Sequence, residues 1–148
     1  MKPTLPLQFL LGLLLAIPAV VQAQHAAPTG RWRTIDDDTG KPKSVVEVYL
    51  ARDGSYAGKV VEILDTKDGP NPLCDKCTGS NHNQPIKGMV ILWGLKPTDE
   101  GWGGGMVLDP ERGKAYRSKL RLLDGGNRLG VSGCIAFICR SQEWLREP

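Results

Sequence analysis

The stretch Lys114–Leu123, KAYRSKLRLL, carries the clearest alternation in the chain. One set of alternate side chains is apolar or small and the other is basic: Tyr116, Ser118, Leu120 and Leu122 against Arg117, Lys119 and Arg121. Side chains two residues apart share a face of a β-strand. The stretch therefore predicts a strand with one buried face and one solvent-exposed face.

Seven further runs also alternate apolar with other residues, and each is short and bounded by Gly, Pro, Asp or Asn. They are Gly30–Ile35, Ser44–Ala51, Ser55–Leu64, Ile86–Leu95, Gly104–Leu108, Arg128–Ala136 and Arg140–Arg146. Turns such as Asp124-Gly125-Gly126-Asn127 join several of them and favour antiparallel pairing of neighbours. With no long helical pattern to cover such a sheet, we predict an all-β fold, a single eight-stranded antiparallel up-and-down barrel.

The first residues predict export. Lys2 precedes the apolar run Phe9–Ile17, and Val21-Gln22-Ala23 has the small residues of a signal-peptidase site. We expect cleavage near Ala23, a single domain over residues 24–148, and a periplasmic or secreted protein. No later segment has the roughly 20 apolar residues of a membrane span, and no cysteine stands at the cleavage point to carry a lipid anchor.

The composition also restricts the class of partner. The 148 residues carry a formal net charge of +3 and no run of basic residues, which argues against nucleic-acid binding. The four cysteines of an exported chain are expected to form disulfides. Local pairing, Cys74 with Cys77 and Cys134 with Cys139, closes the shortest loops and is favoured; the crossed pairings stay open.

Between the third and fourth predicted strands, the segment Asp65–Pro85 lacks any apolar period. A segment of this length without regular structure is expected to be held by a cross-link, such as a disulfide staple, or to have a function. We expect a stapled surface loop, either passive or a lid over one barrel mouth. The motif of Cys74 and Cys77 also fits a redox site, and with His82 a zinc site, but its place in a proline-rich loop and export both favour a disulfide.

Four stretches of the chain resemble an uncharacterised family of small exported bacterial proteins, DUF2147. They are GRWRTIDDDTGKPKSVVEVY at Gly30–Tyr49, PIKGMVILWGLK at Pro85–Lys96, GGGMVLDPERGKAYRSKLRL at Gly103–Leu122 and GCIAFICRSQEW at Gly133–Trp144. The resemblance implies one lipocalin-like barrel and supplies no catalytic residue.

A shorter resemblance concerns barrel closure. Gly30-Arg31-Trp32 and the arginines Arg140 and Arg146 are similar to the opening Gly-x-Trp and closing Arg of lipocalin-like (calycin) barrels. In a closed barrel the first and last strands are neighbours, so we expect an arginine to lie over the Trp32 ring.

Other motifs predict little chemistry. The acidic run Asp36–Gly40 lacks the spacing of an EF-hand loop and is expected to be a solvated turn. The glycines of Gly101–Gly105 are expected to form a bend or bulge, within a loop Lys96–Gly104. No catalytic, metal or cofactor site is predicted.

We therefore expect a non-enzymatic exported binding protein that takes a small apolar or amphipathic ligand at a barrel mouth. The segment Asp65–Pro85 and the loop Lys96–Gly104 would edge that mouth. The candidate ligand residues are Trp93, Trp102, Trp144 and His82. The alternative is a cell-envelope interaction module that binds a protein or glycan through its outer surface. A hydrolase or thiol oxidoreductase is a third hypothesis.

Overall fold

The computed structural model describes residues 27–148, so the predicted signal segment Met1–Ala23 lies outside the described residues. Eight strands follow one another: β1 (Gly30–Ile35), β2 (Pro42–Leu50), β3 (Tyr56–Ile63), β4 (Val90–Thr98), β5 (Gly101–Asp109), β6 (Lys114–Leu123), β7 (Arg128–Ile135) and β8 (Ile138–Arg146). Two single-turn 3₁₀ helices, η1 (Gly79–Asn81) and η2 (Asp124–Gly126), lie in the connections.

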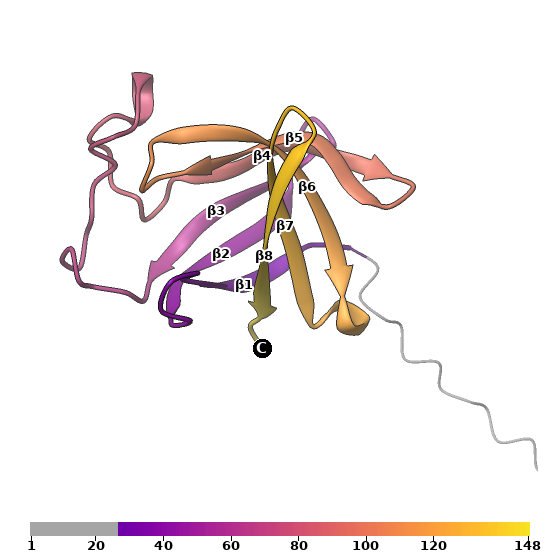
Figure 1. Cartoon of the computed structure of the whole chain (residues 1–148), viewed down its shortest axis with the longest axis horizontal. Helices are drawn as coiled ribbons and strands as arrows, with labels where there is room; N and C mark the ends of the chain where they lie inside the picture. The colour runs from indigo at the N-terminus through magenta and orange to yellow at the C-terminus, as the bar shows by residue number, and fades with distance from the viewer. Residues whose placement is uncertain (1–26) are drawn as a thin grey trace, which may run out of the picture.

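Each strand pairs antiparallel with its neighbours in the sequence, and β1 also pairs with β8 (Figure 1). Trp32 stands opposite Arg146 and Arg33 opposite Leu145 where this last pairing closes the barrel. The prediction of an eight-stranded antiparallel up-and-down barrel is therefore confirmed. Closure pairs every strand on both sides and removes exposed sheet edges.

The prediction of a loop over Lys96–Gly104 is wrong. β4 continues to Thr98, β5 begins at Gly101, and Pro97 pairs with Trp102, so only two residues turn between the strands. The predicted bulge does exist, because the register of β5 against β6 shifts between Trp102 and Gly105. Gly105 is required there, since a Cβ would collide with the Trp93 carbonyl.

The barrel interior is filled by large apolar side chains. Alternate residues of the strands point inward and are almost fully buried: Trp32, Val46, Val48, Val60, Leu92, Leu95, Leu120, Leu129 and Trp144. At Gly58 even an added Cβ would press on Leu92 and Val46. The core therefore occupies the space in which a larger barrel would hold a ligand.

In an up-and-down barrel, alternate connections lie at opposite ends. The β1–β2, β3–β4, β5–β6 and β7–β8 connections share one end, called here the loop end. The chain start and the β2–β3, β4–β5 and β6–β7 turns share the other, called here the Trp32 end. The two segments predicted to edge one mouth, Asp65–Pro85 and Lys96–Gly104, consequently lie at opposite ends of the barrel.

Candidate functional site

Arg146 covers Trp32 at the Trp32 end. Its guanidinium carbon lies 4.1 Å from the centre of the indole. Arg146 Nε donates to the Gly126 carbonyl at 2.6 Å and Nη1 to the Thr29 carbonyl at 3.0 Å, while Trp32 Nε1 donates to the Pro28 carbonyl at 2.8 Å. Burial lowers the pKa of the Arg146 guanidinium. This end is a structural plug.

Arg140, the other arginine expected at the plug, has a different position. It stands opposite Gly133 near the β7–β8 turn, at the loop end, and it is exposed. Only Arg146 lies over Trp32, because β8 runs the length of the barrel between the two arginines.

The structure does not bring the four candidate ligand residues together. Trp144 is buried in the core, whereas Trp102 packs edge-on against Tyr56 with ring centres 5.9 Å apart. Trp93 is 37% exposed, and its partner in the register is Met106 rather than an inward-facing residue. His82 is exposed in the β3–β4 connection, where Nδ1 lies 2.9 Å from the Cys77 carbonyl oxygen.

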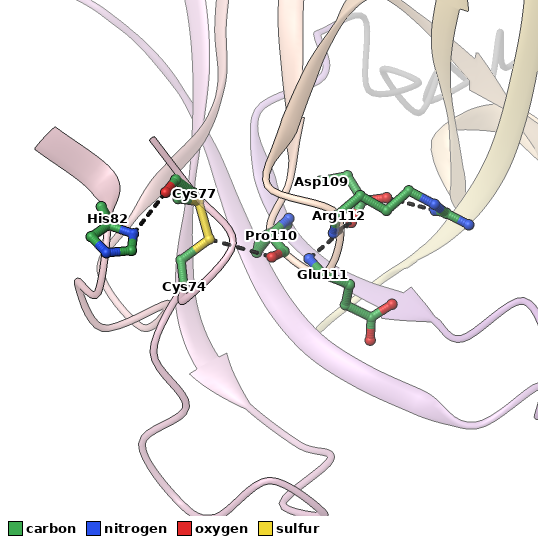
Figure 2. Close-up of a disulfide and its surroundings, with 7 residues drawn as sticks. All are labelled: Cys74, Cys77, His82, Asp109, Pro110, Glu111 and Arg112. Carbon is green, nitrogen blue, oxygen red and sulfur yellow. Dashed lines mark hydrogen bonds and ion pairs between the residues drawn. A yellow bond between two sulfur atoms is a disulfide. The ribbon is translucent and has the colours of Figure 1, made fainter. Parts of the chain in front are cut away.

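The structure joins Cys74 to Cys77 and Cys134 to Cys139, which is the local pairing. The first disulfide lies against the β5–β6 turn (Figure 2), with Cys74 Sγ 3.3 Å from the Pro110 carbonyl oxygen. A Cβ at Gly113 would collide with the Lys76 carbonyl. The β3–β4 connection, residues 64–89 and called here the disulfide segment, is thus docked closely on this turn.

The disulfide segment covers the barrel wall rather than a mouth. Ile91 and Leu108 alternate with the inward-facing Leu92 and Val107, so they face outward, yet both are buried. They belong to one apolar cluster with both cysteines of the segment. The segment contacts the β5–β6 turn, and its cysteines share an apolar cluster with Ile91 and Leu108, which supports the stapled surface loop of the two expectations.

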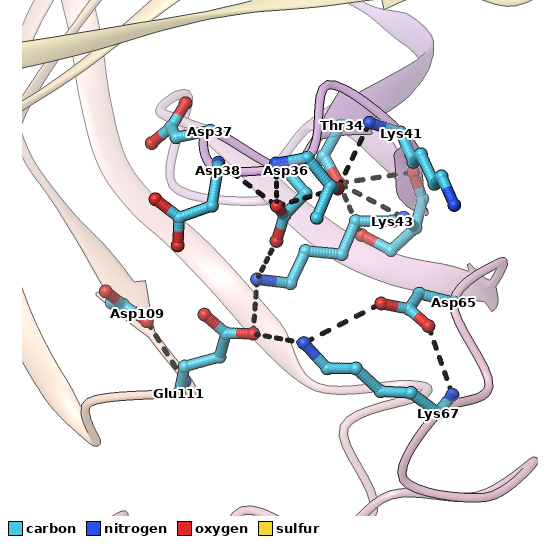
Figure 3. Close-up of polar contacts among 12 residues, drawn as sticks. Thr34, Asp36, Asp37, Asp38, Lys41, Lys43, Asp65, Lys67, Asp109 and Glu111 are labelled. Carbon is cyan, nitrogen blue, oxygen red and sulfur yellow. Dashed lines mark hydrogen bonds and ion pairs between the residues drawn. The ribbon is translucent and has the colours of Figure 1, made fainter.

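A chain of ion pairs ties the connections of the loop end together (Figure 3). Lys43 Nζ lies 2.5 Å from Glu111 Oε1 and 3.9 Å from Asp36 Oδ2, and Lys67 lies 4.0 Å from the same Glu111 oxygen. Hydrogen bonds from the Thr39 backbone and hydroxyl, helped by Lys43, hold the pKa of Asp36 below its ordinary value. The acidic run is a hydrogen-bonded turn joined to its neighbours.

A groove of about 770 Å³ lies on the outer face of β5, β6, β7 and β8, beside the β4–β5 turn. Its walls carry basic, acidic and hydroxyl side chains in a mixed arrangement: Lys119, Arg121, Asp99, Glu100, Glu143, Ser132 and Ser141, with Trp102 at one side. Arg121 reaches Glu100 at 3.3 Å, and the Ser132 and Ser141 hydroxyls are 2.6 Å apart. A second, smaller pocket lies in the disulfide segment, lined by Gln84 and Lys87 among others.

The sequence reasoning missed this groove. The outward-facing charges of Lys114–Leu123 predict a solvent-exposed face, and nothing in one strand's pattern shows how neighbouring strands curve. A local signal does exist for a second missed feature, the β7–β8 turn, where four apolar residues stand between Cys134 and Cys139.

Residues 27–148 contain no helix that is long and apolar enough to cross a membrane. Within the same described range, no three His, Cys, Asp or Glu side chains are grouped so as to hold a metal ion.

The comparisons with known proteins give a family and a similar fold. A family model described as "Uncharacterized protein conserved in bacteria (DUF2147)" matches residues 30–146. A solved structure described as "Protein HP1028 from the human pathogen Helicobacter pylori belongs to the lipocalin family" superposes with a TM-score of 0.68 at 19% identity, over 82% of this chain and 83% of that one. No curated protein matches the sequence. At this identity the likeness shows the fold, which is lipocalin-like.

Proposed function

The chain belongs to the DUF2147 family, and we propose that it is an exported binding protein that takes a small hydroxyl-rich ligand, such as a glycan chain, in its outer groove. The observation that carries this proposal is the groove on β5–β8, whose volume of about 770 Å³ falls within the range of small-molecule sites. The two disulfides of the described domain support export, because they persist in oxidising compartments.

The side chains of the groove favour a neutral, hydroxyl-rich ligand. Lys119 and Arg121 offer donors, and Asp99, Glu100 and Glu143 offer acceptors, so neither sign of charge dominates. The hydroxyls of Ser132 and Ser141 can each both donate and accept. A ligand with many hydroxyl groups could satisfy this mixture, whereas a strongly charged ligand would meet like charges.

A titration with soluble neutral oligosaccharides tests the proposal. Backbone amide shifts in NMR spectra are expected to move at Ser132 and Ser141. Ser141→Trp fills the groove and should abolish the shifts. Glu47→Trp places the same ring on the outer face of β2, away from the groove, and should leave binding unchanged. Equal binding by both variants would contradict the proposal.

A second candidate is an apolar or amphipathic ligand inside the barrel, as the lipocalin-like fold suggests. One observation favours it: the Ser118 hydroxyl is buried among inward-facing side chains and has no hydrogen-bond partner among residues 27–148. The packed core opposes it, since Leu92, Leu95 and Leu120 fill the interior. In the same titration, shifts at Ser118 and its inward-facing neighbours would favour this second candidate.

A further inference from the structure

The turn between β7 and β8 presents an apolar surface to solvent. We define the apolar tip as residues 135–138, which read Ile-Ala-Phe-Ile. Phe137 is 92% exposed, Ile135 68% and Ile138 67%, so three large apolar side chains stand side by side in water. Figure 1 shows this turn projecting at the top of the view, away from the C-terminus. Exposed clusters of this kind mark interaction sites.

The apolar tip is held in shape by covalent and backbone bonds. The Cys134–Cys139 disulfide closes the hairpin directly behind it. Ile135 pairs with Ile138, so the ladder continues to the tip and only Ala136 and Phe137 turn. Because the strands pair up to Ile135 and Ile138, few backbone polar groups are left unpaired at the apex. Ala136 has a φ of 53°, a turn conformation that favours glycine, yet the position has an apolar side chain.

Two arginines flank the apolar tip. Arg117 stands opposite Cys134 on the neighbouring strand β6, and Arg140 follows Cys139 directly. Both are exposed, and neither makes an ion pair with any residue of the described domain. On the same side, Asp37 accepts a hydrogen bond from the neutral Gln142 amide at 2.6 Å and keeps its negative charge. The tip is thus flanked by two cations that have no carboxylate partner within the described domain.

We propose that the apolar tip inserts into the interface of an anionic phospholipid bilayer, with Arg117 and Arg140 binding lipid phosphates. Apolar side chains that enter this region to a depth of about 5–10 Å gain burial, and adjacent cations gain electrostatic attraction. Arginine suits the second role because its planar guanidinium binds phosphate through two parallel hydrogen bonds. The hairpin pairs its own backbone groups, which removes the main cost of entering an apolar medium.

The shape of the tip favours a bilayer over a protein partner. A stable protein interface buries about 800 Å² on each side and requires matched surfaces. The apolar tip is a convex two-residue turn, and the groove proposed above for ligand binding lies on the outer face of the sheet rather than at this apex. A fluid lipid surface needs no shape complementarity.

Flotation with vesicles tests the proposal, using the disulfide-bonded protein as the cell produces it. The vesicles contain phosphatidylglycerol and phosphatidylethanolamine. The double variant Phe137→Ser/Ile138→Ser is expected to lower the bound fraction at least about tenfold. Leu50→Ser is the matched control, because Leu50 is 59% exposed at the Trp32 end; it should leave binding within about twofold.

Two further measurements distinguish binding through the tip from binding through other surfaces. Arg117→Gln/Arg140→Gln should weaken binding to these vesicles several-fold and change binding to phosphatidylcholine vesicles little. In Phe137→Trp, lipids brominated on their acyl chains should quench the new fluorescence. Equal binding by wild type and Phe137→Ser/Ile138→Ser would overturn the proposal. The proposal would also be overturned if the tip residues mediated self-association, or binding to another protein, while the protein did not bind the vesicles.

Discussion

The guanidinium of Arg146 lies over the Trp32 ring with its central carbon 4.1 Å from the ring centre, and the same two residues are register partners where β1 meets β8. One contact thus covers the Trp32 end and joins the two strands whose pairing closes the barrel. The β1–β8 register extends over only two residue pairs. A backbone hydrogen bond from Glu147 to Arg31 and the Arg146–Trp32 contact add to this pairing.

Arg146→Met is expected to lower the free energy of unfolding by about 1–3 kcal/mol. The variant keeps the apolar stem and loses the cation–π contact together with the hydrogen bonds to Gly126 and Thr29. Urea unfolding followed by tryptophan fluorescence measures the change. Arg140→Met, at an exposed position of the same strand, should stay within about 0.5 kcal/mol of wild type. Equal effects of the two variants would contradict the assignment of the plug to Arg146.

Gly113→Ala is expected to lower the free energy of unfolding by about 2–4 kcal/mol. A Cβ there meets the Lys76 carbonyl, and the φ of 64° adds strain for any residue with a side chain. Gly40→Ala is the matched control, since Gly40 has a φ of 69° and nothing within 4 Å of an added Cβ. That control should cost only about 1 kcal/mol. Hydrogen exchange should speed up around Cys74 and Cys77 in Gly113→Ala alone.

Asp36 predicts a pH dependence of stability. Its folded-state pKa lies below the ordinary value of 3.8, so its stabilising effect is complete above that value and is lost as the pH falls through the folded-state pKa. The gap in unfolding free energy between wild type and Asp36→Asn should therefore be constant near neutral pH and close in acid. Asp38→Asn serves as a control, because its exposed side chain makes no hydrogen bond within the described domain, and it should change stability little. A gap that widened in acid would contradict the interpretation.

Ser118→Ala is expected to raise the free energy of unfolding by about 1 kcal/mol. The hydroxyl is buried with no hydrogen-bond partner in the part of the chain that the structure describes, and its removal ends that desolvation cost. Ser44→Ala should act in the opposite direction, because the Ser44 hydroxyl lies 2.8 Å from Thr34 Oγ1. Thermal and urea unfolding of both variants test the pair. Destabilisation by Ser118→Ala as large as that by Ser44→Ala would show that the hydroxyl has a partner in solution.

The Lys114–Leu123 pattern predicted the bounds of β6 to the residue. Its strict alternation with basic side chains also allows only one assignment of the side chains to the buried and exposed faces. The Gly101–Gly105 stretch misled the prediction, because glycines there serve close backbone approach inside a hairpin rather than a loop. The mouth assigned to Trp93, Trp102, Trp144 and His82 failed for another reason. A strand pattern shows where a strand ends but not at which end of the barrel that strand end lies, because this depends on the order of the strands around the barrel.

By itself the sequence determined the number of strands and their order, because these depend on alternation and turn residues. It favoured the local pairing of the cysteines through short loop closure, and the structure selected that pairing over the crossed ones. Only the tertiary structure decided that Ile91 and Leu108 lie under the disulfide segment, that the outer face of β5–β8 is hollowed, and that Phe137 stands free. A period of two fixes which side chains share a face of one strand. It does not fix how bulges, twist and closure curve that face against segments far away in the chain.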